Sequence, residues 1–179
     1  MLHSYIEKLL LENNLAEFTL SPASVRPRIN AKRQEISLKG PILDNAPKKL
    51  MAEPTVAIIL HQVLQAVAFM HGKNVSHRDL KPENIMYNPR THQVKIIDFG
   101  FACISKDKLR VFCGTPSYMS PEIVNKKDYS GSAADVWACG VILFVMLTGQ
   151  VPFKSTMEKE LYRKISKGVY SFGKQEVKN

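Results

Sequence analysis

Hydrophobic residues recur at helical spacing between Thr55 and His71, and this is the first long regular pattern in the chain. The residues that follow the pattern are Ile58, Ile59, Val63, Leu64, Val67, Ala68 and Met70. Gly72 comes directly afterwards and is a residue type at which helices commonly end. We therefore predict a helix over residues 55–71, and the number of hydrophobic positions indicates that it is largely buried.

Two shorter patterns follow this helix. Residues 85–87 and 94–97 are rich in strand-forming side chains, and the polar residues 88–93 between them contain a proline, which predicts a β-hairpin. Further along, residues 136–149 form the longest uncharged apolar stretch. It is shorter than the about 20 residues that cross a bilayer, so we predict a buried helix and no membrane span.

The two ends of the chain have weaker patterns. Ser4 and Glu7 have the spacing of a capping box, so residues 1–35 are expected to hold a short helix followed by a proline-containing linker. Residues 173–179 form a short polar tail. The first 20 residues lack the features of a secretory signal, and the expected location is cytoplasmic, with the nucleus as a further possibility.

Composition and charge exclude several classes of protein. The chain has 179 residues, of which 45% are hydrophobic and 23% charged, as in a globular protein with one main domain. Its net charge of +9 is spread along the chain without a strongly basic segment, so we expect no specific binding of nucleic acid. Cys103, Cys113 and Cys139 lack the C-x-x-C spacing of a zinc site and are expected to be reduced thiols.

The residues with candidate chemistry lie on both sides of the predicted hairpin. Residues 77–84 precede its first strand and residues 98–100 follow its second strand, so the hairpin brings the two segments together. Phosphoryl transfer needs an oriented hydroxyl, a divalent metal ion and positive charge near the phosphates. Asp79 can orient the hydroxyl, Lys81 can reach the phosphoryl group, and the oxygens of Asn84 and Asp98 suit Mg²⁺.

Several motifs in order resemble those of the eukaryotic protein kinases. They are His-Arg-Asp-Leu-Lys-Pro-Glu-Asn at 77–84, Asp-Phe-Gly at 98–100, Ser-Pro-Glu at 120–122 and Asp-Val-Trp at 135–137. Lys81 in this setting is typical of serine/threonine kinases, and residues 112–118 are similar to the calmodulin-dependent and AMP-activated kinase branch. The resemblance implies a mostly α fold of the α+β family, the large helical lobe of a kinase.

The resemblance also implies roles for individual residues and the cofactors ATP and Mg²⁺. Asp79 would be the catalytic base, supported together with Lys81 by Thr115; the ATP-binding set would be Lys81, Glu83, Asn84, Met86 and Asp98, and the metal ligands would be Asn84 and Asp98. Met86 would lie under the adenine, and Glu83 and Asp128 are candidates for contacting a basic peptide. The motif at 77–84 corresponds to the catalytic loop of the family, and Asp135 is expected to cap its helix and to tie down this loop.

The sequence departs from the family at two points. The resemblance covers residues 36–172, which we interpret as a partial kinase domain, incomplete at both ends. No G-x-G-x-x-G motif and no Val-Ala-Ile-Lys strand precede the catalytic loop. Two functions therefore remain: an ATP-dependent kinase that phosphorylates Ser or Thr of protein substrates, with a completing or regulatory protein partner, and a catalytically inactive binding or scaffold module.

The activation segment, residues 98–122, is the second departure. In related kinases the arginine at the position of Arg78 contacts a phosphate carried by a threonine shortly before the residues that correspond to Cys113 and Gly114. This chain has Val111 and Phe112 there, and Ser105 is the nearest hydroxyl upstream. We expect a segment that is phosphorylation-independent, disordered or held by a partner.

Overall fold

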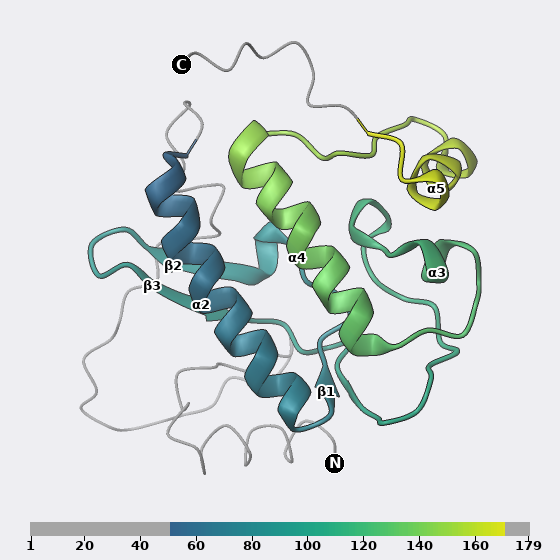
Figure 1. Cartoon of the computed structure of the whole chain (residues 1–179), viewed down its shortest axis with the longest axis horizontal. Helices are drawn as coiled ribbons and strands as arrows, with labels where there is room; N and C mark the ends of the chain where they lie inside the picture. The colour runs from purple at the N-terminus through teal and green to yellow at the C-terminus, as the bar shows by residue number, and fades with distance from the viewer. Residues whose placement is uncertain (1–50, 171–179) are drawn as a thin grey trace.

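The computed structural model describes residues 51–170, which form four α-helices and two small antiparallel sheets (Figure 1). The helices are α2 (Glu53–Gly72), α3 (Pro121–Val124), α4 (Gly131–Thr148) and α5 (Glu158–Lys167). The strands are β1 (Val75–Ser76), β2 (Ile85–Asn88), β3 (Gln93–Ile96) and β4 (Cys103–Ile104). The predicted helix and linker of residues 1–35 and the polar tail of residues 173–179 lie outside the described residues.

Helix α2 confirms the helix predicted from the hydrophobic spacing, and it ends at Gly72 as expected. Only one of its faces is buried, the face formed by Val56, Ile59, Val63, Val67 and Met70. The expectation that the helix is largely buried was wrong, because Ile58 and Leu64 are 40% and 43% exposed. The helix packs against the rest of the domain on one side only, so its opposite face meets solvent.

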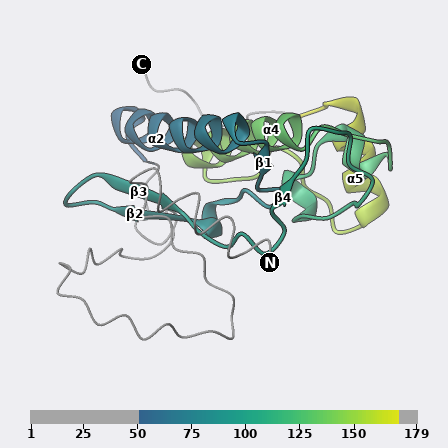
Figure 2. The ribbon, with the colours of Figure 1, turned by 90° about the horizontal axis from the view of Figure 1, so that it is seen from below.

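Helices α2 and α4 lie next to each other and form one layer of the molecule (Figures 1 and 2). Ser130 caps α4 by accepting a hydrogen bond from the Ala133 backbone N–H, and Gly149 ends it with a φ of 70°. The expectation that Asp135 caps this helix was wrong, since Asp135 lies one turn further along. By length and composition alone both helices could cross a bilayer, a property that buried helices of globular domains share.

The hairpin of β2 and β3 lies beneath this layer of helices (Figure 2). Its register pairs Ile85 with Ile96 and Asn88 with Gln93, which confirms the predicted hairpin. Ile85 and Ile96 are 0% and 1% exposed and belong to the same core cluster as the buried face of α2. This packing fixes the open end of the hairpin, where the two candidate segments join it.

The second sheet fixes the start of the catalytic loop. Its strands β1 and β4 pair antiparallel, with Val75 opposite Ile104 and Ser76 opposite Cys103. Residue 77 therefore leaves β1 directly beside the chain that follows the Asp-Phe-Gly motif. Gly131 at the start of α4 packs against β1 so closely that an added Cβ would lie 2.5 Å from the Ser76 hydroxyl oxygen.

Candidate active site

The carboxylate of Asp79 is the centre of a cluster of polar side chains. Its Oδ1 accepts a hydrogen bond from the Thr115 hydroxyl at 2.8 Å, and its Oδ2 accepts one from Lys81 Nζ at 2.8 Å. Lys81 Nζ also donates to the Thr115 oxygen at 2.9 Å. The three side chains therefore form a closed triangle, which fixes the orientation of a carboxylate that is itself 5% exposed.

Asn84 connects the end of the catalytic loop to the same carboxylate. Its side-chain Nδ2 donates to the Asp79 backbone oxygen at 2.9 Å and approaches Oδ2 at 3.4 Å. A short 3₁₀ turn, Pro82–Asn84, places the side chain there, and β2 begins immediately afterwards. Because the amide nitrogen is committed to Asp79, the amide oxygen is the atom that remains for a ligand.

His77 supports Asp79 from inside the core. Its Nε2 donates to the Ile97 carbonyl oxygen at 3.0 Å, and its Nδ1 accepts the backbone N–H of Asp79 at 3.3 Å. These partners require the neutral ring with its proton on Nε2. Burial lowers the pKa of His77, which favours the same neutral form. His77 thus links the catalytic loop to the residue that precedes the Asp-Phe-Gly motif.

Asp135 holds the backbone of the catalytic loop from helix α4. Its carboxylate accepts the backbone N–H groups of His77 and Arg78 at 2.9 Å and 2.8 Å, and a hydrogen bond with His71 Nε2 measures 2.9 Å. Arg78 has a φ of 68°, a conformation that side chains other than glycine rarely adopt. The expected tie between Asp135 and the catalytic loop is thereby observed, although the helix cap is Ser130.

Asp98 lies two residues beyond the end of β3, with an exposed side chain that forms no hydrogen bond with the three residues of the triangle. It has a φ of 61°, and its Oδ1 accepts the backbone N–H of Gly100 at 3.3 Å. The aromatic ring of the next residue, Phe99, lies 4.9 Å from the ring of His77. Asp98 is therefore placed by a buried neighbour while its carboxylate faces solvent, as a metal ligand requires.

The donor set fits Mg²⁺. The Asn84 amide and the Asp98 carboxylate both offer oxygen, and Mg²⁺ in phosphoryl-transfer sites typically takes one or two protein ligands, with phosphates and water completing its shell. Among residues 51–170 no three His, Cys, Asp or Glu side chains form a metal-binding group. The arrangement thus suits a metal ion that arrives with phosphate.

Two other residues of the candidate ATP set lie at the edge of this cluster. Met86, on β2 opposite Lys95, is half-buried, and Glu83 is exposed on the 3₁₀ turn. Burial raises the pKa of the Tyr118 phenol, and the charge of nearby Glu83 raises it further. Neither residue hydrogen-bonds to the triangle, so the structure leaves both available to other groups.

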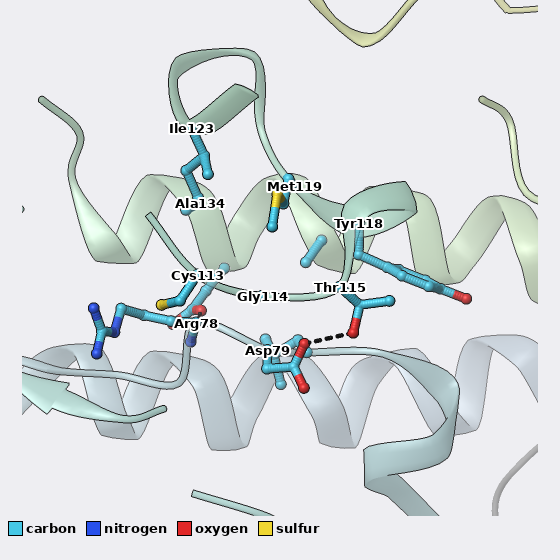
Figure 3. Close-up of a pocket in the computed structure, with 12 residues that line it drawn as sticks. Arg78, Asp79, Cys113, Gly114, Thr115, Tyr118, Met119, Ile123 and Ala134 are labelled. Carbon is cyan, nitrogen blue, oxygen red and sulfur yellow. Dashed lines mark hydrogen bonds between the residues drawn. The ribbon is translucent and has the colours of Figure 1, made fainter. Parts of the chain in front are cut away.

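Gly114 allows the activation segment to reach Asp79. Figure 3 shows Cys113, Gly114 and Thr115 passing beside Arg78 and Asp79, with the Thr115 hydroxyl directed at the Asp79 carboxylate. An added Cβ on Gly114 would lie 2.8 Å from the Arg78 carbonyl oxygen, and its φ is 119°. The sequence analysis did not identify this requirement; the only signal for it is a glycine directly before Thr115.

Comparison with known proteins agrees with this geometry. The family description "Protein kinase domain" matches residues 34–178. Rice CBL-interacting protein kinase 5 is 42% identical over 138 residues, which are 74% of this chain and 30% of that protein. Arabidopsis CBL-interacting serine/threonine-protein kinase 2 is 40% identical over 133 residues, 72% of this chain and 29% of that protein.

A buried aspartate held by a lysine and a threonine, followed by an Asp-Phe-Gly motif on a helical domain, is the arrangement that the kinase motifs of the sequence predict. The chain belongs to the protein kinase family, and its relatives are named as serine/threonine kinases. It spans less than a third of the length of the curated relatives that it matches.

Proposed function

We propose that this chain provides the catalytic part of an ATP- and Mg²⁺-dependent kinase that phosphorylates Ser or Thr of protein substrates. The triangle of Asp79, Lys81 and Thr115 is the observation that carries the proposal. A buried carboxylate with defined orientation is needed to accept the proton of an attacking hydroxyl, and a neighbouring ammonium is needed where negative charge develops.

Each member of the triangle has a separate task in the proposed reaction. Asp79 orients the substrate hydroxyl and accepts its proton as the oxygen bonds to the γ-phosphorus and the bond from that phosphorus to the bridging oxygen of the ADP leaving group breaks. Lys81 balances negative charge on the phosphoryl oxygens. Thr115 donates to Asp79 and accepts from Lys81, so it keeps both charged groups in register without contributing charge of its own.

ATP and Mg²⁺ complete the proposed site. Asn84 and Asp98 would hold Mg²⁺, which would supply Lewis-acid chemistry to the phosphates, and Met86 would provide an apolar surface for the adenine. The 179-residue sequence contains neither G-x-G-x-x-G nor Val-Ala-Ile-Lys, the two kinase motifs that contact the ATP phosphates. We therefore expect weak ATP binding, with transfer slower by orders of magnitude than in a kinase that has those phosphate contacts.

Partners and location follow from the same assignment. Several relatives are named CBL-interacting kinases, and we propose a regulatory or completing protein partner for this chain too. The similarity of residues 112–118 to the calmodulin-dependent and AMP-activated kinases supports our proposal that the chain belongs to that branch. Reduced thiols suit the proposed cytoplasmic or nuclear location.

The alternative function is a binding or scaffold module without turnover, which the missing phosphate motifs favour. Equilibrium binding of Mg·ATP and transfer of its γ-phosphate to a Ser/Thr peptide distinguish the two. We expect Mg²⁺-dependent binding that is lost in Asp98→Ala and kept in Asp107→Ala, an exposed control. A folded chain that binds no nucleotide at any Mg²⁺ concentration would contradict the kinase proposal and support the module.

A further inference from the structure

Tyr129 holds the activation segment by three hydrogen bonds. The backbone N–H of Leu109 donates to the Tyr129 carbonyl at 2.8 Å, and the backbone N–H of Tyr129 donates to the Leu109 carbonyl at 3.1 Å. The Tyr129 hydroxyl donates to the Val111 carbonyl at 2.8 Å. Tyr129 is 2% exposed and Val111 is 66% exposed, so at Val111 the contact depends on the phenol and not on packing of the valine side chain.

The same side chain lies close to Arg78. Burial lowers the pKa of Arg78, an interaction with the Tyr129 side chain raises it, and the net change is upward. Because the phenol gives its proton to Val111, its oxygen is free to accept from the guanidinium. Arg78 Nε donates to the Phe101 carbonyl at 2.6 Å. In this structure the guanidinium thus has neutral partners at the position where related kinases use a phosphate.

The contacts of Tyr129 lead directly to the triangle. Val111 precedes Thr115 by four residues, and Arg78 is the neighbour of Asp79. The ring of Phe112, between Val111 and Thr115, lies 6.4 Å from the ring of Tyr129. Tyr129 is therefore bonded to the activation segment and lies close to Arg78. These two segments meet at the Thr115–Asp79 hydrogen bond, whose side chains face each other in Figure 3.

Ser105, the nearest residue with a hydroxyl upstream of Val111, is bonded within a local turn and does not contact Arg78 by a hydrogen bond. Ser105 Oγ donates to the Asp107 carbonyl at 3.2 Å and accepts the Asp107 backbone N–H at 3.0 Å. These bonds close a turn at the surface. Ser105 is thus engaged within its own turn, while Tyr129 supplies the contact to Arg78.

We propose that Tyr129 is a positioning residue whose hydroxyl holds Thr115 against Asp79, so that the activation segment keeps this arrangement without a phosphate. The inference rests on the proposed function, because the arrangement serves phosphoryl transfer. It replaces a regulated anion with a fixed phenol between Arg78 and the Val111 backbone. Ordering of the segment is then a permanent property of the fold.

Hydrogen–deuterium exchange of the full chain without nucleotide tests this role. In Tyr129→Phe, which keeps the ring and removes the hydroxyl, we expect a peptide covering residues 106–119 to exchange roughly threefold to tenfold faster, the effect of one lost hydrogen bond. Peptides from α4 should be unchanged. Tyr162→Phe is the matched control, since it removes a phenol hydroxyl on α5, away from the activation segment. Phosphatase treatment of the wild-type chain should change nothing.

Three results would overturn the proposal. They are unchanged exchange of residues 106–119 in Tyr129→Phe, equal acceleration of all peptides including α4, and faster exchange of this segment after phosphatase treatment. The measurement needs no turnover. An inactive chain with the expected exchange would contradict the kinase proposal alone, whereas an active chain with unchanged exchange would contradict the role of Tyr129 alone.

Discussion

Asp135 on helix α4 accepts the backbone N–H of Arg78 at 2.8 Å, and Arg78 has a φ of 68°. The buried carboxylate thus compensates for an unfavourable backbone conformation at the residue next to Asp79. With the N–H of His77 and the ring of His71 as further partners, Asp135 connects the central helix to the catalytic loop. The position of Asp79 therefore depends on the contact between helix α4 and the catalytic loop.

Asp135→Asn should lower the free energy of unfolding by about 2–3 kcal/mol, because an amide loses one charged acceptor and points a donor at a backbone N–H. Urea denaturation measures the change. Asp128→Asn is the control, since the ion pair of Asp128 with Arg110 is exposed and should be worth less than about 1 kcal/mol. Equal effects of the two substitutions would contradict the structural role of Asp135.

Gly114→Ala should destabilise the chain by about 2 kcal/mol or more, because its φ of 119° disfavours any Cβ and that atom would meet the Arg78 carbonyl. Gly140→Ala is the control, for which we expect a change in stability of the opposite sign. No neighbouring atom lies within 4 Å of the Cβ that would be added at Gly140 in α4, so this change should stabilise the helix by about 1 kcal/mol. Thermal or urea unfolding distinguishes the two, and a neutral Gly114→Ala would show that the close approach is absent.

The stability of the chain should fall below neutral pH through His77. Burial lowers the pKa of His77 in the folded state, whereas the unfolded state takes up a proton near the ordinary value of 6.5. The unfolded state then binds more protons, so the contribution of neutral His77 is complete above pH 6.5 and is lost as the pH falls. By pH 5.5 the loss should reach at most about 1.4 kcal/mol.

The comparison of wild type with His77→Gln isolates this effect, since the other titrating groups are common to both proteins. Urea midpoints at pH 7.5 and 5.5 give the difference. The variant should be less stable at pH 7.5 and should lose less stability on acidification. A parallel decline of the two proteins would show that His77 is not the group responsible.

The thiol of Cys139 should be unreactive in the folded chain. Burial raises its pKa to about 12, so at pH 8 its thiolate fraction, and its rate of reaction with a disulfide reagent, should be roughly a thousandfold below that of an unfolded cysteine. Labelling followed by peptide mass analysis, with and without urea, measures this. Labelling of Cys139 at the same rate under both conditions would mean that α4 is not buried as described.

The parts of the fold that the sequence predicts are those that depend on periodic patterns. Helix α2 and the β2–β3 hairpin follow from residue spacing and from the Asn-Pro segment between the strands. The exposure of Ile58 and the role of Tyr129 could not be predicted, because they depend on which elements pack together. Tyr129 lies 18 residues from Val111, and no local pattern links a phenol to a distant carbonyl.

The features of the site can likewise be separated into those that the sequence predicts and those that it does not. The types and order of Asp79, Lys81, Asn84 and Asp98 predict them as candidates, since phosphoryl transfer restricts which side chains can act. The helix cap was misassigned because Ser130 and Asp135 are both residue types that favour caps, and only the backbone shows which of them stands at the helix start. The positive φ of Arg78 has no signal in its residue type.

The most direct test of the account is the rate of γ-phosphate transfer from Mg·ATP to a Ser/Thr peptide under single-turnover conditions, for wild type and Asp79→Asn. The account predicts slow but measurable transfer by the wild-type chain and a loss of roughly a hundredfold or more in Asp79→Asn, with Asp107→Asn unchanged. Equal rates for wild type and Asp79→Asn, or no transfer by the folded wild-type chain, would contradict it.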